Sequence, residues 1–362
     1  MMGVQKKPYD FLLSLLECHS PSGHEAAATR VWLDYVNPFA DEVMTDAYGN
    51  AFAVLNPKAK QSVMFDGHSD EVGMMVTYID EEGYLWVSAI GGIDAKVLPG
   101  MRVLVHAPDG DIKGVVGTIA PHMQTGDLAA RTIQMNEIYV DIGAKDKADA
   151  GRWVRSGVTV TIDHGPVRLL GDTLCARACD NRIGIWSSAE ALRRCKAAGV
   201  KHKVIACSNV QEEIGLHGAA MAAYRWDPDV CLVVDVGNST DFPDTSKHMR
   251  NDIRLGGGPC QRIGSAAHPA VVDRLDEVAA QKKIKLQRIP IPVRSGTNAG
   301  SIYISRKGIP CGILSTPNRY MHSPSETIDL NDLDAIPTLM TEFVKSIKAG
   351  ETFTVHKGGR LK

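Results

Sequence analysis

The chain has 362 residues, of which 44% are hydrophobic and 6% aromatic, a composition typical of a globular protein with one large core or two modest ones. Forty Lys and Arg residues oppose 42 Asp and Glu residues, so the formal net charge is only −2. This balance excludes a strong overall attraction to nucleic acid or to an anionic membrane and favours a small partner.

The N-terminal apolar stretch from Phe11 to Leu16 is bracketed by Asp10 and Glu17, and no cleavage site follows it, so we do not expect a signal peptide. No uncharged run approaches the roughly 20 apolar residues that a membrane span needs. The eight cysteines form no CxxC pair and lie mainly in apolar segments, which favours reduced thiols over disulfides. We therefore expect a soluble, cytoplasmic protein that binds neither membrane nor nucleic acid.

The first 70 residues combine helical and strand-like patterns. Apolar side chains recur at helical spacing after Pro8, and a second helix is expected over 25–35, after the Ser-Pro-Ser-Gly break. Strands are expected over 50–55 and 63–65. Between about residues 73 and 168 the pattern changes to short Val, Ile and Thr segments separated by Gly, Pro and Asp, which predicts an all-β region. Its expected strands include 101–106, 114–119 and 158–162.

From residue 172 onward strands and helices alternate. Helices are expected over 181–198, 269–282 and 330–347, where Pro337 fits an early turn or a kink, and strands over 203–210, 230–236 and 310–315. The fold class is therefore α/β, with a mixed sheet and helices on both faces. We expect one α/β domain (1–72 and 169–362) interrupted by a small β domain (73–168), with a loose tail over 357–362.

The candidate functional residues share one position, because each follows an apolar run that is typical of a buried parallel strand. In an open α/β sheet the carboxyl ends of the strands form the ligand crevice, so four distant segments should converge there. These residues are His68 and Asp70 after 63–65, Glu212 and Glu213 after 204–210, Asp235 after 230–234, and His322 shortly after 313–314.

Each of these residues also has an ordinary structural explanation. His68 could be a hydrogen-bonded core histidine, and Asp180 could be the N-cap of the following helix. Glu212 and Glu213 could be first-turn acids of a helix starting at Ile214. These alternatives stay open for each residue taken alone.

Together the residues form a set that suits divalent metal ions. Two imidazoles and three carboxylates without a thiolate fit zinc, cobalt or manganese. If Asp180 bridges two ions, His68 and Asp235 can complete the first ligand set, while Glu213 and His322 complete the second. Three carboxylates and one bridging hydroxide neutralise two divalent cations, so such a cluster can be buried.

The remaining two acids suit supporting roles. Neighbouring side chains of an extended segment point in different directions, so Glu213 can bind metal while Glu212 faces the metal-bridging water as general base. Asp70 lies two residues beyond His68 and can accept the N–H of its imidazole, which would orient the ring. The predicted chemistry is amide hydrolysis assisted by two metal ions.

At this point the sequence resembles metallopeptidase family forty-two, which includes tetrahedral and glutamyl aminopeptidase-like enzymes. The resemblance covers nearly the whole chain and depends on five motifs in the same order and spacing. These are Gly67-His68-Ser69-Asp70-Glu71-Val72-Gly73, Cys179-Asp180-Asn181-Arg182-Ile183-Gly184, Gln211-Glu212-Glu213-Ile214-Gly215-Leu216-His217-Gly218-Ala219, Val234-Asp235-Val236 and Met321-His322-Ser323-Pro324.

The resemblance implies a di-metal aminopeptidase that hydrolyses the N-terminal bond of peptides, with two zinc or cobalt ions, or manganese. It assigns the five ligands and the base to the positions named above. It further implies that 73–168 is a PDZ-like dimerisation domain and that dimers assemble into a tetrahedral dodecamer. Two alternatives remain, a related di-metal N-deacylase or dipeptidase, and a catalytically silent binding scaffold.

Three positions depart from the family pattern or stand out within it. Asn298 stands where an acid is common, which leaves the substrate preference open. Cys179 precedes the expected bridging Asp180 and is either a buried, inert thiol or a point of sensitivity to oxidation. His217 either contacts substrate or lies on a helix surface.

Overall fold

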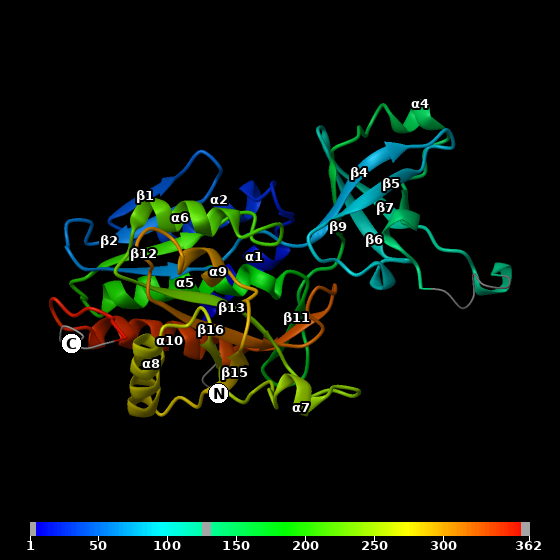
Figure 1. Ribbon diagram of the computed structural model, residues 1–362. Helices are drawn as coiled ribbons and strands as arrows, with labels where there is room; N and C mark the ends of the chain where they lie inside the picture. Colours follow the sequence, from blue (N-terminus) through cyan, green and yellow to red (C-terminus); the bar gives the residue numbers. More distant parts are fainter. Residues whose placement is uncertain (1–4, 125–131, 356–362) are drawn as a thin grey trace.

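The computed structural model describes residues 5–124 and 132–355, and it divides into an α/β body and a closed β barrel beside it (Figure 1). The body is built on an eight-stranded mixed sheet with the order β1-β2-β12-β3-β13-β16-β14-β15, in which β12, β3, β13 and β16 run parallel. Its strands are β1 (Glu42–Thr45), β2 (Ala51–Leu55), β3 (Ser62–Asp66), β12 (Lys203–Ser208), β13 (Val230–Asn238), β14 (Cys260–Gly264), β15 (Gln287–Ile291) and β16 (Cys311–Asn318).

Helices cover both faces of this sheet, as predicted for the fold class. Alternate residues of the central strands point to opposite faces, so Val63 and Phe65 pack in one core while Met64 packs in the other. The first face carries α1 (Lys6–Glu17), α2 (Ala26–Val36), α5 (Cys179–Ala197), α8 (Pro269–Lys282) and α10 (Leu330–Ser346), and the second carries α6 (His217–Trp226) and α9 (Ala299–Ile302).

The barrel closes in the order β4-β5-β8-β7-β6-β9 around its own apolar core. Its strands are β4 (Gly73–Ile79), β5 (Leu85–Ile90), β6 (Arg102–Ala107), β7 (Gly110–Val116), β8 (Tyr139–Asp141) and β9 (Thr159–Ile162). A separate three-stranded sheet contains β10 (Val167–Arg168), β11 (Thr173–Ala176) and β17 (Glu326–Asp329). The short helices are η1 (Ala95–Val97), η2 (Pro121–Met123), η3 (Met135–Glu137), α4 (Lys147–Ala150) and α7 (Lys247–Arg250).

Most expected elements are confirmed within a few residues, but one barrel strand was misplaced. The expected strand over 114–119 is β7, which begins at Gly110 and ends at Val116. It begins early because β6 and β7 form a hairpin that pairs Ala107 with Gly110, so the ladder starts at the turn. The expected loose tail over 357–362 lies outside the described residues.

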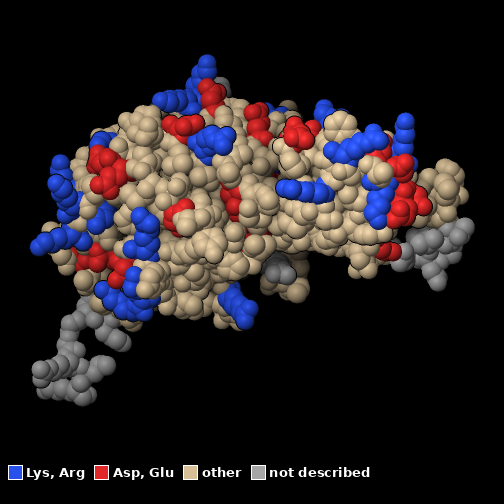
Figure 2. All heavy atoms as spheres, turned by 90° about the horizontal axis from the view of Figure 1, so that it is seen from above, with Lys and Arg blue, Asp and Glu red and all other residues tan. Residues whose placement is uncertain are grey.

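The surface and the thiols agree with the composition. Basic and acidic side chains are interspersed on the face shown in Figure 2. All eight cysteines lie within the described ranges and are free. Among the helices of residues 5–124 and 132–355, none combines the length and apolar character that crossing a bilayer needs.

Candidate metal centre

The predicted site residues meet at the carboxyl ends of the parallel strands. His68 follows β3 and forms a bridge with Asn209, which follows β12. The strand expected over 230–236 is β13, which continues to Asn238 alongside β16, so Asp235 lies inside the strand. The Asp235 carboxylate therefore projects from within the sheet, where the parallel ladder holds its backbone.

Asp180 lies at a kink near the start of α5, where it and Asn181 have non-helical backbone angles. The alternative N-cap role for Asp180 was wrong, because Asn181 Oδ1 accepts the N–H of Gly184 at 2.9 Å and caps the helix. Asn181 also donates to the Val234 carbonyl at 2.8 Å and ties the kink to β13. This arrangement leaves the Asp180 carboxylate free to face the two histidines.

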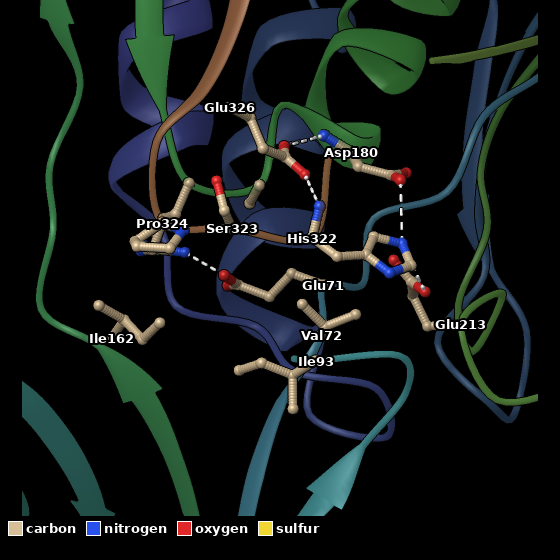
Figure 3. Close-up of a pocket in the computed structure, with 12 residues that line it drawn as sticks. Glu71, Val72, Ile93, Ile162, Asp180, Glu213, His322, Ser323, Pro324 and Glu326 are labelled. Carbon is tan, nitrogen blue, oxygen red and sulfur yellow. Dashed lines mark hydrogen bonds and ion pairs between the residues drawn. The ribbon is translucent and has the colours of Figure 1, made fainter. Parts of the chain in front are cut away.

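The Asp180 carboxylate lies between the two imidazoles and presents one oxygen to each. Its Oδ1 is 3.2 Å from His68 Nε2, and its Oδ2 is 3.4 Å from His322 Nε2. His322 Nε2 is also 3.6 Å from Glu213 Oε2, and His68 Nε2 is 3.7 Å from Glu212 Oε2. Figure 3 shows His322 between Asp180 and Glu213 at the edge of the pocket.

Within the described residues, three sets of donor atoms are close enough to hold a cation, each with all its atoms within 4.8 Å of one another. Asp180 belongs to two of them, with His68 and Asp235 in one and with Glu213 and His322 in the other. The third set is His68, Glu212 and Glu213. The alternative role of the two glutamates as first-turn acids was wrong, because α6 begins only at His217. All six residues, hereafter the cation site, are brought together.

The charges of the cation site fit divalent cations. Glu213 Oε1 is buried and has no hydrogen-bond partner in the described structure, which is costly unless a cation occupies the space beside it. Carboxylate oxygens and imidazole nitrogens without thiolates suit zinc, cobalt or manganese.

The pKa values report the same excess of negative charge. Burial, with Asp235 and Asp180 adding to it, raises the pKa of Glu212 to about 8 against the opposing effect of His68. Burial and the Asp180 charge raise the pKa of Asp235 to about 7. Burial opposes charge on Asp180 too, but hydrogen bonds from His322 and His68 keep its pKa below the ordinary carboxyl range.

Asp70 contacts both the first histidine and the Glu212-Glu213 pair. Its Oδ1 is 3.3 Å from His68 Nδ1, the ring nitrogen opposite the one that faces Asp180. Its oxygens also accept the backbone N–H groups of Glu212 at 2.9 Å and Glu213 at 3.1 Å, and Ser22 Oγ donates to Oδ2 at 2.6 Å. Asp70 can therefore fix the His68 ring and the loop that carries the two glutamates.

Glu326 was missed by the sequence reasoning. It is buried in β17, and its two oxygens accept the backbone N–H groups of Asp180 and His322, each at 2.8 Å (Figure 3). Burial, with Asp180 adding to it, raises its pKa to about 8. The available signal was an acid four residues after His322 in a segment of strand-like composition, where burial would demand partners.

The three unusual positions have different surroundings. Cys179 is fully buried, and burial raises the pKa of its thiol well above the ordinary value, which favours the inert alternative. Asn298 is buried beside Asp66, where it favours the charged carboxylate, and its amide atoms lack a hydrogen bond of good geometry in the described structure. His217 is the first residue of α6, and its Nδ1 lies 3.3 Å from Gln211 Oε1.

Comparison with known proteins places this geometry in a family. The M42 glutamyl aminopeptidase family matches residues 49–339. The lysyl aminopeptidase of Pyrococcus furiosus is 32% identical over 344 residues, which cover 94% of this chain and 97% of that protein. A TET aminopeptidase from the marine sediment archaeon Thaumarchaeota archaeon SCGC AB-539-E09 superposes with a TM-score of 0.90 at 30% identity, covering 95% of this chain and 98% of its own.

A third relative forms large symmetric assemblies. The TET1 peptidase of Pyrococcus horikoshii, which can form a tetrahedron or a large octahedral shell, has a TM-score of 0.83 at 26% identity and covers 94% of this chain and 100% of its own. Fold and site thus define a metallopeptidase, a hydrolase of peptide bonds that works with divalent metal ions. The chain belongs to the M42 glutamyl aminopeptidase family.

Proposed function

We propose that this protein is a di-metal aminopeptidase that removes the N-terminal residue of peptides. The observation that carries the proposal is the position of Asp180, which presents one carboxylate oxygen to His68 and the other to His322. Asp180 would bridge two cations, with His68 and Asp235 on the first and Glu213 and His322 on the second. Zinc or cobalt is the expected metal, with manganese as the third possibility.

In this proposal Glu212 is the general base. When bound, the cations supply Lewis-acid polarisation of the scissile carbonyl and acidify the attacking water. The Glu212 carboxylate takes the proton of that water and returns it to the leaving amine nitrogen. Burial and the neighbouring acids raise the pKa of Glu212 to about 8 in the metal-free protein, and bound cations would lower it toward the charged form that a general base requires. Asp70 would hold the His68 ring through Nδ1, which leaves Nε2 available to a cation.

The division of the chain is also part of the proposal. Residues 1–72 and 169–362 would form the catalytic domain, and 73–168 a dimerisation domain. The barrel region exposes large apolar side chains, among them Trp153 at 60% and Met123 at 66%, which favours a protein interface there. By analogy with the assembling TET1 peptidase, dimers would build a tetrahedral dodecamer. Light scattering of the purified protein measures the mass of the assembly directly, and a monomer would contradict the proposed dimers and dodecamer.

The eight free cysteines favour a reducing compartment, so we place the enzyme in the cytoplasm. Glutamyl and lysyl residues are the first N-terminal residues to test, because the chain matches the M42 glutamyl aminopeptidase family and one relative is a lysyl aminopeptidase.

The test of the function is a panel of chromogenic aminoacyl substrates, free and N-acetylated, that includes lysyl and glutamyl residues. Each is assayed with zinc, cobalt and manganese after removal of bound metal with a chelator. Cleavage of free-amine substrates alone supports an aminopeptidase. Cleavage confined to blocked substrates would favour the N-deacylase alternative, and no metal-dependent cleavage with metal bound would favour the silent scaffold.

A further inference from the structure

The barrel reaches the cation site through the loop that follows β5. The carbonyl oxygen of Gly92 lies 3.1 Å from His322 Nδ1, and accepts its N–H when that nitrogen carries the proton. A Cβ built on Gly92 would lie 2.9 Å from His322 Nδ1 and 3.0 Å from its Cε1, distances that real Cβ atoms avoid or rarely tolerate. No side chain therefore fits between this loop and the imidazole.

The neighbouring glycine contacts the other ligand of the same proposed cation. Gly91 has a φ of +70°, in the left-handed region that favours glycine, and a Cβ on it would lie 3.1 Å from the Cβ of Glu213. Ile93, which follows Gly92, lines the pocket together with Val72 (Figure 3). The loop 91–93 thus packs directly on His322 and Glu213 and leaves the ligands of the first cation to other segments.

The two histidines are restrained in different ways. His68 is 1% exposed, and its Nδ1 faces Asp70, which belongs to the same chain segment. The His322 side chain is 31% exposed and comes from a loop, so fewer neighbours hold its ring. When Nδ1 donates to the Gly92 carbonyl, Nε2 carries the lone pair and faces Asp180 and Glu213.

From this contact we infer that the barrel positions a ligand of the catalytic centre, with the Gly92 carbonyl holding His322 in the orientation that binds the second cation. The inference rests on the proposed two-cation function. Gly92 is a positioning residue, because it acts through His322. The barrel then contributes to metal binding within one subunit, in addition to any role in assembly.

The test is a titration of metal-free protein with cobalt. Calorimetry measures the binding of each ion, and the visible absorption of bound cobalt reports its coordination. Gly92→Ala adds the one Cβ that meets the imidazole. Gly165→Ala is the matched control, because a Cβ there meets nothing within 4 Å and its φ lies outside the left-handed region. We expect two cobalt ions in the wild type and in Gly165→Ala. In Gly92→Ala the first ion should bind unchanged and the second roughly 10–100-fold more weakly.

The outcomes separate this inference from the proposed function. If the wild type binds fewer than two ions, the two-cation function fails, and the inference fails with it. If the wild type binds two and Gly92→Ala binds both unchanged, or loses both together, the positioning role is overturned while the function stands. A crystal structure of the cobalt-loaded wild type keeps the inference testable if Gly92→Ala does not fold: a Gly92 carbonyl turned away from His322 would overturn it.

Discussion

Two clusters of buried charge are adjacent in the chain, and they are neutralised in different ways. One is the cation site, whose His68 and glutamate loop contact Asp70, and the other surrounds the next residue, Glu71. Glu71 pairs with Arg177 and Arg182, so its cluster, hereafter the arginine cluster, contains its own cations. In the cation site the acids pair with histidines instead. Among the described residues, the ion-pair partners of Asp180, Glu212 and Glu213 are the imidazoles of His68 and His322.

The pKa values record this difference. Burial opposes charge on Glu71, but Arg177 and Arg182 outweigh it and lower the pKa. Burial and like charges instead raise the pKa of Glu212 and Asp235. A buried carboxylate paired with arginines is a structural element, because an arginine keeps its charge. Buried carboxylates paired only with imidazoles form a site that can bind metal, because an imidazole can release its proton when a cation binds.

The largest expected effect is catalytic. Glu212→Gln keeps the shape of the side chain and removes the group that takes the proton, so kcat should fall roughly 10²–10⁴-fold. Metal analysis by mass spectrometry should find the cation content unchanged, because Glu212 is outside both proposed ligand sets. Retained activity would contradict its assignment as base, and loss of metal would mean that it is a ligand.

The next effect tests the arginine cluster. Arg182 is fully buried, so Arg182→Met leaves the Glu71 charge with one partner fewer and should lower the free energy of unfolding by roughly 3–5 kcal/mol. Urea denaturation of metal-free protein measures this. Arg152→Met is the control, because Arg152 is 74% exposed beside Asp149 and should change stability by less than about 0.5 kcal/mol. A change below 1 kcal/mol for Arg182→Met would show that this cluster is not structural.

A buried acid of the cation site should behave in the opposite way. Asp235→Asn removes one of several like charges, so metal-free protein at pH 8 should become more stable, on the order of 1 kcal/mol. Cobalt should then stabilise the variant less than the wild type. The matched control is Asp332→Asn, because Asp332 is a buried acid that accepts the N–H groups of Gly256 and Gly258, and it should destabilise. Destabilisation by Asp235→Asn without metal would remove the contrast between the clusters.

The smallest effect is the pH dependence of the metal-free protein. The raised pKa values of Glu212, about 8, and Asp235, about 7, mean that the folded state holds protons which the unfolded state has released. Their contribution to stability is complete below the ordinary carboxyl pKa and is lost as the pH rises through 7 to 8. The melting temperature should therefore fall between pH 6 and pH 8.5. The lowered pKa of Glu71 has the opposite sign and costs stability only as the pH falls through its folded value.

Saturating cobalt should abolish the alkaline decline, because ligation favours the deprotonated acids, and binding should release protons. Calorimetric scans with and without metal check this. Equal slopes in the two conditions would mean that the buried acids do not hold the cations.

Much of this molecule was predictable because its signals are local. Apolar runs such as 230–234 predicted the buried parallel strands, and the acids and histidines after them predicted a site at one sheet edge. The errors arose where contact with a neighbouring segment sets the boundary or the cap of an element. β7 begins at Gly110 because β6 pairs with it, and Asn181 rather than Asp180 caps the helix because the kink is tied to β13.

By itself the sequence determined the α/β class and the family resemblance, and it predicted the six residues of the cation site, because each depends on residue type and spacing within short segments and motifs. Only the tertiary structure decided that the two oxygens of Asp180 face different histidines, that Glu326 joins Asp180 to His322, and that the Gly92 carbonyl reaches the same ring. His322 and Gly92 are 230 residues apart. Such contacts depend on how separately folded segments pack, and no local pattern contains that information.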